Sequence, residues 1–363
     1  MKKFVVFAGI AVVALASCSK TENVLNNPQQ TGSAITFQPL AAVQTKSTPI
    51  TKYETETGAF RVYGWYQASD NFDPSQAYTL YMNNVLCSYV AGNVDDKDGE
   101  GTWRSTNNYY WPKNGKLTFS AYYPANADVT VDAVTGISIK DYTIADATNQ
   151  VDLMYSDRVF DRVSSTQTDD NKDYDGVDLV FNHALSAADF SVKTAADYGT
   201  DAIKVYSVKI VDACSKGNFA EGYETGKDET HKAKWSDQSD VVAYTVSATE
   251  VYPKYIKKNN DSDKDSEQIG ATCILLPQTF SENIKVVVTY GIKYVDGTDA
   301  KYLDQVAEFP LKGTTDTAGN DINGWEMGKW YHYTLTFTLD TIYFAPSVKD
   351  WVDVNVKDFV VSK

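Results

Sequence analysis

The chain contains few residues of the kinds that perform catalysis or bind metal ions. Among its 363 residues there are three histidines, His183, His231 and His332, and none has a second histidine at the spacing of a metal site. The sequence contains no G-x-S-x-G elbow, no P-loop and no G-x-G-x-x-G motif. We therefore expect no enzymatic activity, no cofactor, and structural or surface roles for the histidines.

Cysteine is also scarce. The chain has four cysteines, Cys18, Cys87, Cys214 and Cys273, and no C-x-x-C pair. The last three are an odd number, so at least one of their thiols is unpaired. Cys87 and Cys273 lie in apolar runs, where a cysteine behaves as a small buried hydrophobic residue. The sequence therefore predicts no disulfide framework.

Basic residues are also few relative to acidic ones. The formal net charge is −15, with 48 acidic residues against 33 basic ones. This balance argues against nucleic acid or an anionic membrane surface as a partner. Tyrosine, at 25 residues, and tryptophan, at 7, are by contrast abundant. Aromatic side chains favour strands, and on a surface they can bind sugars or protein partners.

One acidic segment has some features of a calcium loop. Asp261, Asp263 and Asp265 alternate along the chain as calcium ligands do. The segment lacks the glycine expected at its sixth position, where Ser266 stands, and the glutamate at its twelfth, where Thr272 stands. A solvated loop explains it better than a metal site, and calcium binding is the alternative.

The beginning of the chain has the pattern of an export signal. Two lysines precede an apolar run from Phe4 to Ala16, and the run ends in Leu15-Ala16-Ser17-Cys18. The run is too short to span a bilayer, and no later segment has eighteen consecutive apolar residues. The cysteine at the junction resembles the lipobox of bacterial lipoproteins, in which Cys18 would carry the lipid. An ordinary signal peptide with a chance cysteine is the alternative.

From residue 34 onward the dominant pattern is alternation of apolar and polar residues, interrupted by clusters of Gly, Asn, Asp and Pro. No long stretch shows a period of 3.6. Many short strands separated by turn signals predict an all-β sandwich architecture. The charged stretch from Thr168 to Gly176 is the most plausible domain boundary. The clearest predicted strands are Ile35–Phe37, Phe60–Trp65, Leu117–Tyr122, Val177–Phe181, Ile203–Ile210, Ile284–Tyr290 and Tyr331–Leu339, the last with five apolar residues on one face.

The polar segment after the first predicted strand has two interpretations. Lys46 lies in a polar segment and is followed by Ser47, so a trypsin-like protease can cut between them. Cleavage there would separate Ile35 and Phe37 from the rest of the chain. In the alternative interpretation, Lys46 is only a solvated lysine in a loop.

The other end of the chain continues beyond the strong strand pattern. Such an extension can add as a strand to the open sheet edge of another subunit, or it can pair within its own domain. The apolar and aromatic residues of this candidate donor strand are Ile342, Phe344, Val348, Trp351, Val352, Val354 and Val356.

Several motifs together resemble the fimbrillin, or Mfa-like, family of Bacteroidota, which contains the major-type pilus subunits of type V pili. No single motif is specific, but their order and spacing are. They are Asn108-Tyr109-Tyr110-Trp111-Pro112, the stretch Leu117–Pro124, Val151-Asp152-Leu153-Met154, the stretch Leu179–Ser186, and the stretch Gly324–Thr336.

This resemblance implies two tandem transthyretin-like β-sandwich domains after a lipoprotein signal peptide. Residues 1–17 would be the signal peptide, and residues 18–46 a lipidated tether with a removable first strand. Residues 47–175 and 176–340 would form the two sandwiches. Residues 341–363 would be the donor-strand extension.

The resemblance also implies a function. The chain would be a pilus subunit, exported as a lipoprotein precursor to the outer membrane and held there through Cys18. Proteolysis after Lys46 would open a groove for the C-terminal strand of another copy or of a related pilin, and the extracellular pilus would bind host or bacterial surface receptors. The family's cut often follows arginine, and this chain has lysine. The alternative is a glycan-binding surface lipoprotein that does not polymerise.

Overall fold

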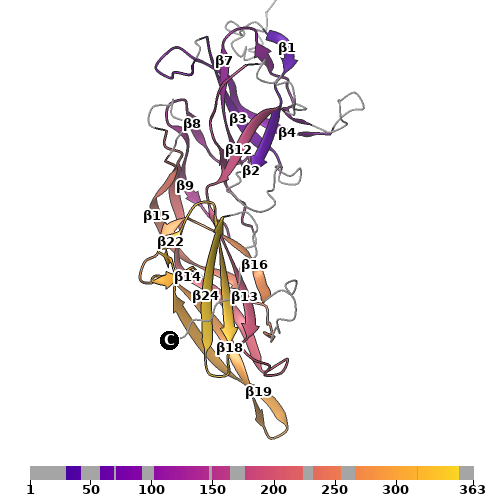
Figure 1. The fold of residues 1–363 in the computed structure, drawn as a ribbon, viewed down its shortest axis with the longest axis vertical. Coiled ribbons are helices and arrows are strands. Elements are labelled where there is room, and N and C mark those ends of the chain that lie inside the picture. The colour runs from indigo at the N-terminus through magenta and orange to yellow at the C-terminus, as the bar shows by residue number, and fades with distance from the viewer. Residues whose placement is uncertain are drawn as a thin grey trace, which may run out of the picture.

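The structure is a computed structural model that describes residues 30–41, 58–68, 71–91, 102–146, 149–163, 176–223, 232–254, 266–316 and 318–350. Its regular elements are strands, so the all-β prediction is confirmed. Within these ranges no helix is long and apolar enough to cross a bilayer. The molecule is elongated, with the first strands at one end and the strands of the second half at the other (Figure 1).

Eight strands form one sheet at the N-terminal end, here called the N-terminal sheet. β10 also pairs with β7, so seven of the strands close into a ring around an aromatic core. In sheet order the strands are β10 (Met154–Ser156), β12 (Val177–His183), β2 (Phe37–Ala41), β5 (Thr102–Ser105), β4 (Thr79–Val90), β3 (Phe60–Gln67), β7 (Lys116–Tyr123) and β11 (Val159–Arg162). A separate two-stranded ribbon pairs β1 (Gln30–Ala34) with β6 (Tyr110–Pro112).

Two further sheets, built mostly from the second half of the chain, pack against each other and are here called the C-terminal sandwich. The four-stranded sheet contains, in order, β16 (Glu267–Leu275), β13 (Ser186–Thr194), β23 (Lys329–Phe337) and β24 (Ile342–Asp350). The other contains β19 (Asp299–Pro310), β18 (Lys285–Asp296), β14 (Ile203–Ala220), β9 (Gly136–Thr143) and β8 (Thr130–Asp132), with β15 (Lys234–Ser247) also paired to β14. Two ribbons complete it: β17 (Gln278–Thr279) with β22 (Gly324–Trp325), and β20 (Thr314–Thr315) with β21 (Asp321–Ile322).

Strand β14 links the two ends of the molecule. Its first half pairs with β18, and its last residues pair with β9, which precedes the N-terminal sheet's β10 in the chain. Phe219 on β14 packs against Tyr155 on β10, with ring centroids 5.1 Å apart. One hydrophobic cluster therefore contains residues from both ends of the molecule. The division into sandwiches at 47–175 and 176–340 stays a prediction.

Six of the seven clearest predicted strands coincide with β3, β7, β12, β14, β18 and β23. The predicted strand Ile35–Phe37 overlaps β2 at Phe37 only, because β2 begins there. One predicted face of β23 is largely correct. Tyr331, Tyr333, Leu335 and Phe337 are buried together on that face. Leu339 was predicted to share it, and this was wrong: β23 ends at Phe337, and Leu339 lies in the following turn with 45% of its surface exposed. Thr338 N donates to Thr341 O at 2.7 Å, and this bond closes the turn before β24.

The three described cysteines are free thiols. Cys87 and Cys273 are buried, as predicted, with 0% and 1% exposure, and Cys214 is half-buried. Burial raises the pKa of the Cys87 thiol to about 12 and that of Cys273 to about 11. These thiols are therefore neutral packing groups and not nucleophiles.

Candidate functional site

The N-terminal strand β2 lies inside the N-terminal sheet and not at its edge. It pairs in parallel with β12 over five residues, from Phe37–Val177 to Ala41–Phe181. On its other side it pairs with β5 at one position only, Phe37–Trp103. Figure 1 shows β2 alongside β12. The residues before Lys46 thus supply a strand that the rest of the sheet encloses.

The side chains of this segment alternate between the core and the outside. Ile35 and Phe37 are 3% and 1% exposed, whereas Thr36 and Gln38 are partly exposed. The Phe37 ring meets Phe119 edge-on at 5.5 Å between centroids, and Phe60 at 6.3 Å. Burying side chains of this size stabilises a fold by about 1.5–3 kcal/mol each.

Strand β12 approaches β2 closely enough to require a glycine at its start. Val177 N donates to Thr36 O at 2.8 Å. Gly176 has φ +134°, and a Cβ atom there would stand 2.5 Å from Phe37 N. From the sequence, Gly176 was predicted only as part of a domain boundary. Its requirement for glycine comes from the backbone of Phe37, which is far away in the chain, so the local sequence does not reveal it.

The C-terminal strand β24 pairs with its own chain in this structure. It runs antiparallel to β23 over nine residues, from Ile342–Phe337 to Asp350–Lys329. The Phe344 ring stacks on Tyr333 at 5.2 Å and on Phe309 at 5.1 Å. Ile342 and Phe344 are 8% and 7% exposed, and Val348 is half-buried. Strand β24 is the edge of its sheet.

The remaining predicted site residues lie outside the described residues. They are Cys18, Lys46, Ser47, Trp351, Val352, Val354 and Val356, together with His231 and the segment Asp261–Asp265. Lipidation, the processing site and the calcium alternative therefore stay predictions.

The two described histidines each contact a carboxylate. His183 Nδ1 lies 2.5 Å from Asp152 Oδ2, and His332 Nδ1 lies 2.9 Å from Asp189 Oδ1. The His332 ring also stacks on Trp330 at 5.0 Å. In the part of the chain that the structure describes, no group of three His, Cys, Asp or Glu side chains could hold a metal ion.

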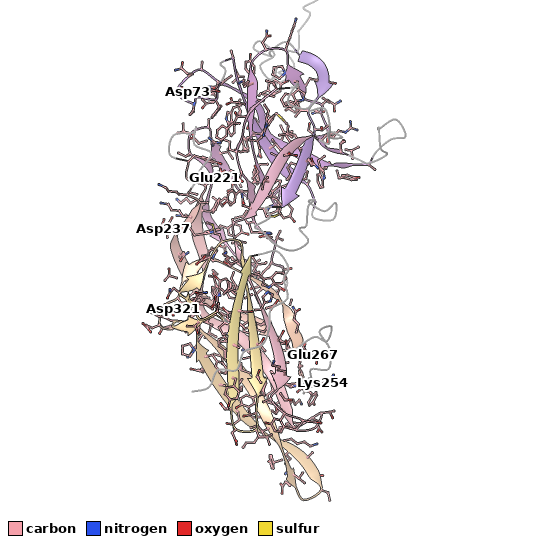
Figure 2. All side chains as sticks on the ribbon, in the orientation of Figure 1. Asp73, Glu221, Asp237, Lys254, Glu267 and Asp321 are labelled. Carbon is pink, nitrogen blue, oxygen red and sulfur yellow. The ribbon has the colours of Figure 1, made fainter. Side chains whose placement is uncertain are left out.

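A buried carboxyl group and a buried guanidinium lie where the two ends of the molecule meet. Glu221, just after β14, is fully buried, and its Oε2 accepts a hydrogen bond from Ile137 N at 2.8 Å. Burial raises the pKa of Glu221 to about 7, against the opposing effects of the Ile137 N–H and of Arg158. Figure 2 places Glu221 at this junction.

Arg158, between β10 and β11, completes the junction. Its guanidinium lies 4.3 Å from the centroid of the Tyr223 ring and donates to Ala133 O at 2.9 Å. The Arg158 backbone N–H donates to Tyr223 Oη at 3.0 Å. These contacts connect the N-terminal sheet to the turn between β8 and β9. Sequence reasoning missed them, because Glu221 and Arg158 are far apart in the chain and belong to no motif.

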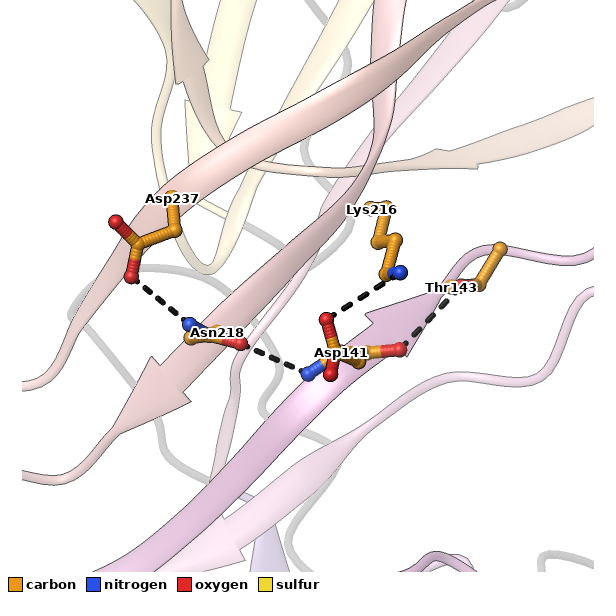
Figure 3. Close-up of polar contacts among 5 residues, drawn as sticks. All are labelled: Asp141, Thr143, Lys216, Asn218 and Asp237. Carbon is orange, nitrogen blue, oxygen red and sulfur yellow. Dashed lines mark hydrogen bonds and ion pairs between the residues drawn. The ribbon is translucent and has the colours of Figure 1, made fainter.

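A second polar cluster crosslinks β9, β14 and β15 (Figure 3). Asn218 Nδ2 donates to Asp237 Oδ2 at 2.8 Å, and Asn218 Oδ1 accepts from Asp141 N at 2.8 Å. Lys216 Nζ lies 3.3 Å from Asp141 Oδ1. Asp141 and Asp237 have φ +54° and +49°, a conformation that aspartate tolerates better than most residues. The cluster joins irregular strands and offers no catalytic arrangement.

The alternative of glycan binding would need exposed tryptophan side chains on which sugars could stack, and few of the described tryptophans are exposed. Of the described tryptophans, Trp65, Trp103, Trp111 and Trp325 are buried, and Trp235 and Trp330 are half-buried. The exposed aromatic residues among the described ones are Tyr78, Tyr89, Tyr252 and Tyr294, each at 36–45% exposure.

Comparison with known proteins finds a matching protein family and solved structures of similar fold. The profile of the fimbrillin-like family matches residues 45–351. No curated protein matches the sequence. A solved fimbrial protein from Bacteroides vulgatus is 17% identical, covers 88% of this chain and 100% of its own, and has a TM-score of 0.57. A candidate cell adhesion protein from Bacteroides uniformis is 14% identical, covers 88% and 99%, and has a TM-score of 0.49. At 17% identity the first of these likenesses shows a shared fold.

Proposed function

This chain belongs to the fimbrillin-like family, and on that premise we propose that it is a pilus subunit that polymerises by protease-activated exchange of strands. The precursor travels to the outer membrane as a lipoprotein anchored through Cys18. A trypsin-like protease cuts after Lys46 and removes the lipid together with β1 and β2. The mature chain, beginning at Ser47, becomes part of an extracellular adhesive pilus.

The observation that carries this proposal is the position of β2 between β12 and β5. Once β2 leaves, β12 presents unpaired backbone groups along one side of the gap, and unpaired strand edges recruit further strands. The rings of Phe60 and Phe119 lose their contact with Phe37. A strand from another copy restores both kinds of contact.

The C-terminal extension supplies that strand. Ile342 and Phe344 occupy alternate positions, as do Val352, Val354 and Val356. Strand β24 is an edge strand whose departure breaks pairing with one neighbour only. Burying five or six apolar side chains contributes on the order of 10 kcal/mol before ordering costs. A non-covalent polymer of this kind resists dissociation. The presence of a donor extension favours a place in the shaft of the pilus.

The experiment is treatment of the purified precursor with trypsin at limiting concentration, followed by electrophoresis in SDS without heating. We expect ladders that collapse on boiling, and Ser47 as the new N-terminus. Trypsin can also cut after Lys52, so the variant with both Lys46→Ala and Lys52→Ala should stay monomeric. The matched control Lys52→Ala, which keeps Lys46, should form ladders. Monomers from every processed variant would overturn the proposal. A lipidated Cys18 on the mature surface form would show an anchor or a free-standing lipoprotein.

A further inference from the structure

The two ends of the chain carry the same pentapeptide pattern. The N-terminal segment is Ile35-Thr36-Phe37-Gln38-Pro39, and the C-terminal segment is Ile342-Tyr343-Phe344-Ala345-Pro346. Isoleucine, phenylalanine and proline recur in the same order at alternate positions. In extended backbone, alternate residues share one face. Ile35 lies just before β2, and the burial of residues 35, 37 and 39 but not 36 and 38 follows the same alternation.

Both segments bury those three side chains. Ile35 and Phe37 are 3% and 1% exposed, and Ile342 and Phe344 are 8% and 7% exposed. Pro39 and Pro346 are also buried. Each phenylalanine meets two aromatic rings, Phe60 and Phe119 for Phe37, and Tyr333 and Phe309 for Phe344. A strand that leaves the second environment therefore brings the side chains that the first one has lost.

The proline restricts how such a strand can enter. Val177 N donates to Thr36 O, so Thr36 and Gln38 direct their backbone polar groups to β12, and Pro39 directs its nitrogen to the opposite side. There β5 pairs with β2 only at Phe37–Trp103. A proline at this position therefore breaks no bond with β12, although proline usually weakens a strand inside a sheet.

Other registers lose this match. A shift by one residue turns the isoleucine, phenylalanine and proline to the outer face. A shift by two residues keeps the same side chains on the inner face, but it places Phe344 at the position of Ile35 or of Pro39. Only the unshifted register places the Phe344 ring against Phe60 and Phe119, where Phe37 lies now.

We propose that residues Ile342–Pro346 of one copy replace Ile35–Pro39 of a second copy in the same register and the same direction, parallel to β12. This inference rests on the proposed function and specifies its partner and register. Ile342, Phe344 and Pro346 take the places of Ile35, Phe37 and Pro39. In this register Ala345 lies beside Asp178, as Gln38 does in the precursor.

Disulfide trapping tests the register. Gln38 and Asp178 are paired residues on the outer face, so a precursor with Gln38→Cys and Asp178→Cys should form an internal disulfide, which serves as the geometric control. For the test, an acceptor with Asp178→Cys and a donor with Ala345→Cys are both processed with protease, mixed and oxidised. Both carry Cys214→Ser, which removes the half-buried native thiol.

The expected result is a covalent dimer that survives boiling and disappears with reductant. Donors with Tyr343→Cys or Ser347→Cys serve as matched controls, because a shift by two residues moves the thiol about 6.6 Å along the strand and out of disulfide reach. These controls should give less than a tenth of the covalent dimer. Thermal unfolding of each variant before processing confirms that it is folded.

The outcomes separate the two proposals. Ladders together with crosslinking from position 343 or 347, or with no crosslink from any of the three positions, would overturn the register and leave strand exchange standing. The absence of heat-labile ladders from processed wild-type chain would overturn the proposed function itself. A dominant crosslink from Ala345→Cys supports both.

Discussion

Gly176 lies at the point where the chain enters β12 beside the N-terminal strand. Alanine there meets two costs, the unfavourable φ of +134° and the overlap with the Phe37 backbone. We expect Gly176→Ala to lower the free energy of unfolding of the uncleaved chain by about 2 kcal/mol or more. Chemical denaturation measures the change.

Gly58 provides the matched control, because its φ is +101° but a Cβ there meets nothing within 4 Å. Gly58→Ala should therefore show only the conformational cost, about 1 kcal/mol. Equal losses in the two variants would contradict the close approach of Gly176 to Phe37.

Glu221 makes the stability of the molecule depend on pH. Burial raises the pKa of the folded state to about 7, above the usual 4.5. The folded protein therefore holds the proton more tightly than the unfolded chain, and this stabilisation is present below pH 4.5 and is lost as the pH rises through 7. Its full size is about 3 kcal/mol.

The measurement is urea unfolding at intervals from pH 4.5 to pH 8 for the wild type and for Glu221→Gln. Glutamine keeps an oxygen that accepts from Ile137 N and has no titrating proton. The wild type should lose stability relative to this variant as the pH rises. Parallel stability curves for the two proteins would show that Glu221 keeps one ionisation state throughout.

Strand β2 is stabilised mainly through one of its two faces. Phe37→Ala removes a ring that is 1% exposed, and such truncations cost about 3–5 kcal/mol. Gln38→Ala changes the outer face of the same strand and should cost less than about 0.5 kcal/mol. Hydrogen exchange of the β12 amides in the uncleaved chain measures the difference, and faster exchange is expected for Phe37→Ala only. Equal exchange rates would contradict the role of Phe37 in holding β2 against β12.

The pairing of β2 with β12 shows why the sequence predicts individual strands but not which strands pair with each other. Alternation in Val177–Phe181 and in Tyr331–Phe337 follows from one buried face, so the sequence indicates these strands directly. The parallel pairing of Phe37 with Val177 joins residues far apart in the chain. No local pattern specifies a partner at that distance. Leu339 shows a different error. The apolar alternation of β23 extends to Leu339 in the sequence, but the strand ends at Phe337 and Leu339 lies in a turn.

The whole molecule should polymerise only when its N-terminal strand is free to leave. In a precursor with Gln38→Cys and Asp178→Cys, the internal disulfide holds β2 in place even after protease has cut the chain. We expect oxidised, cleaved protein to stay monomeric and to form ladders once reductant is added. Electrophoresis in SDS without heating follows the change.

The single variant Gln38→Cys is the control for this experiment. It should polymerise equally with and without reductant, because Asp178 offers no second thiol. Ladders from the oxidised double variant would contradict the need for β2 to leave.

The sequence alone determined the strand content and the burial of Cys87 and Cys273, because each depends on residues close together in the chain. Only the tertiary structure decided that β2 is enclosed between β12 and β5, that β14 joins both ends of the molecule, and that Glu221 lies beside Arg158. These features depend on which distant surfaces fit together. Side-chain packing and backbone pairing select those partners. The alternation of apolar and polar residues along one strand does not specify which other strand it pairs with.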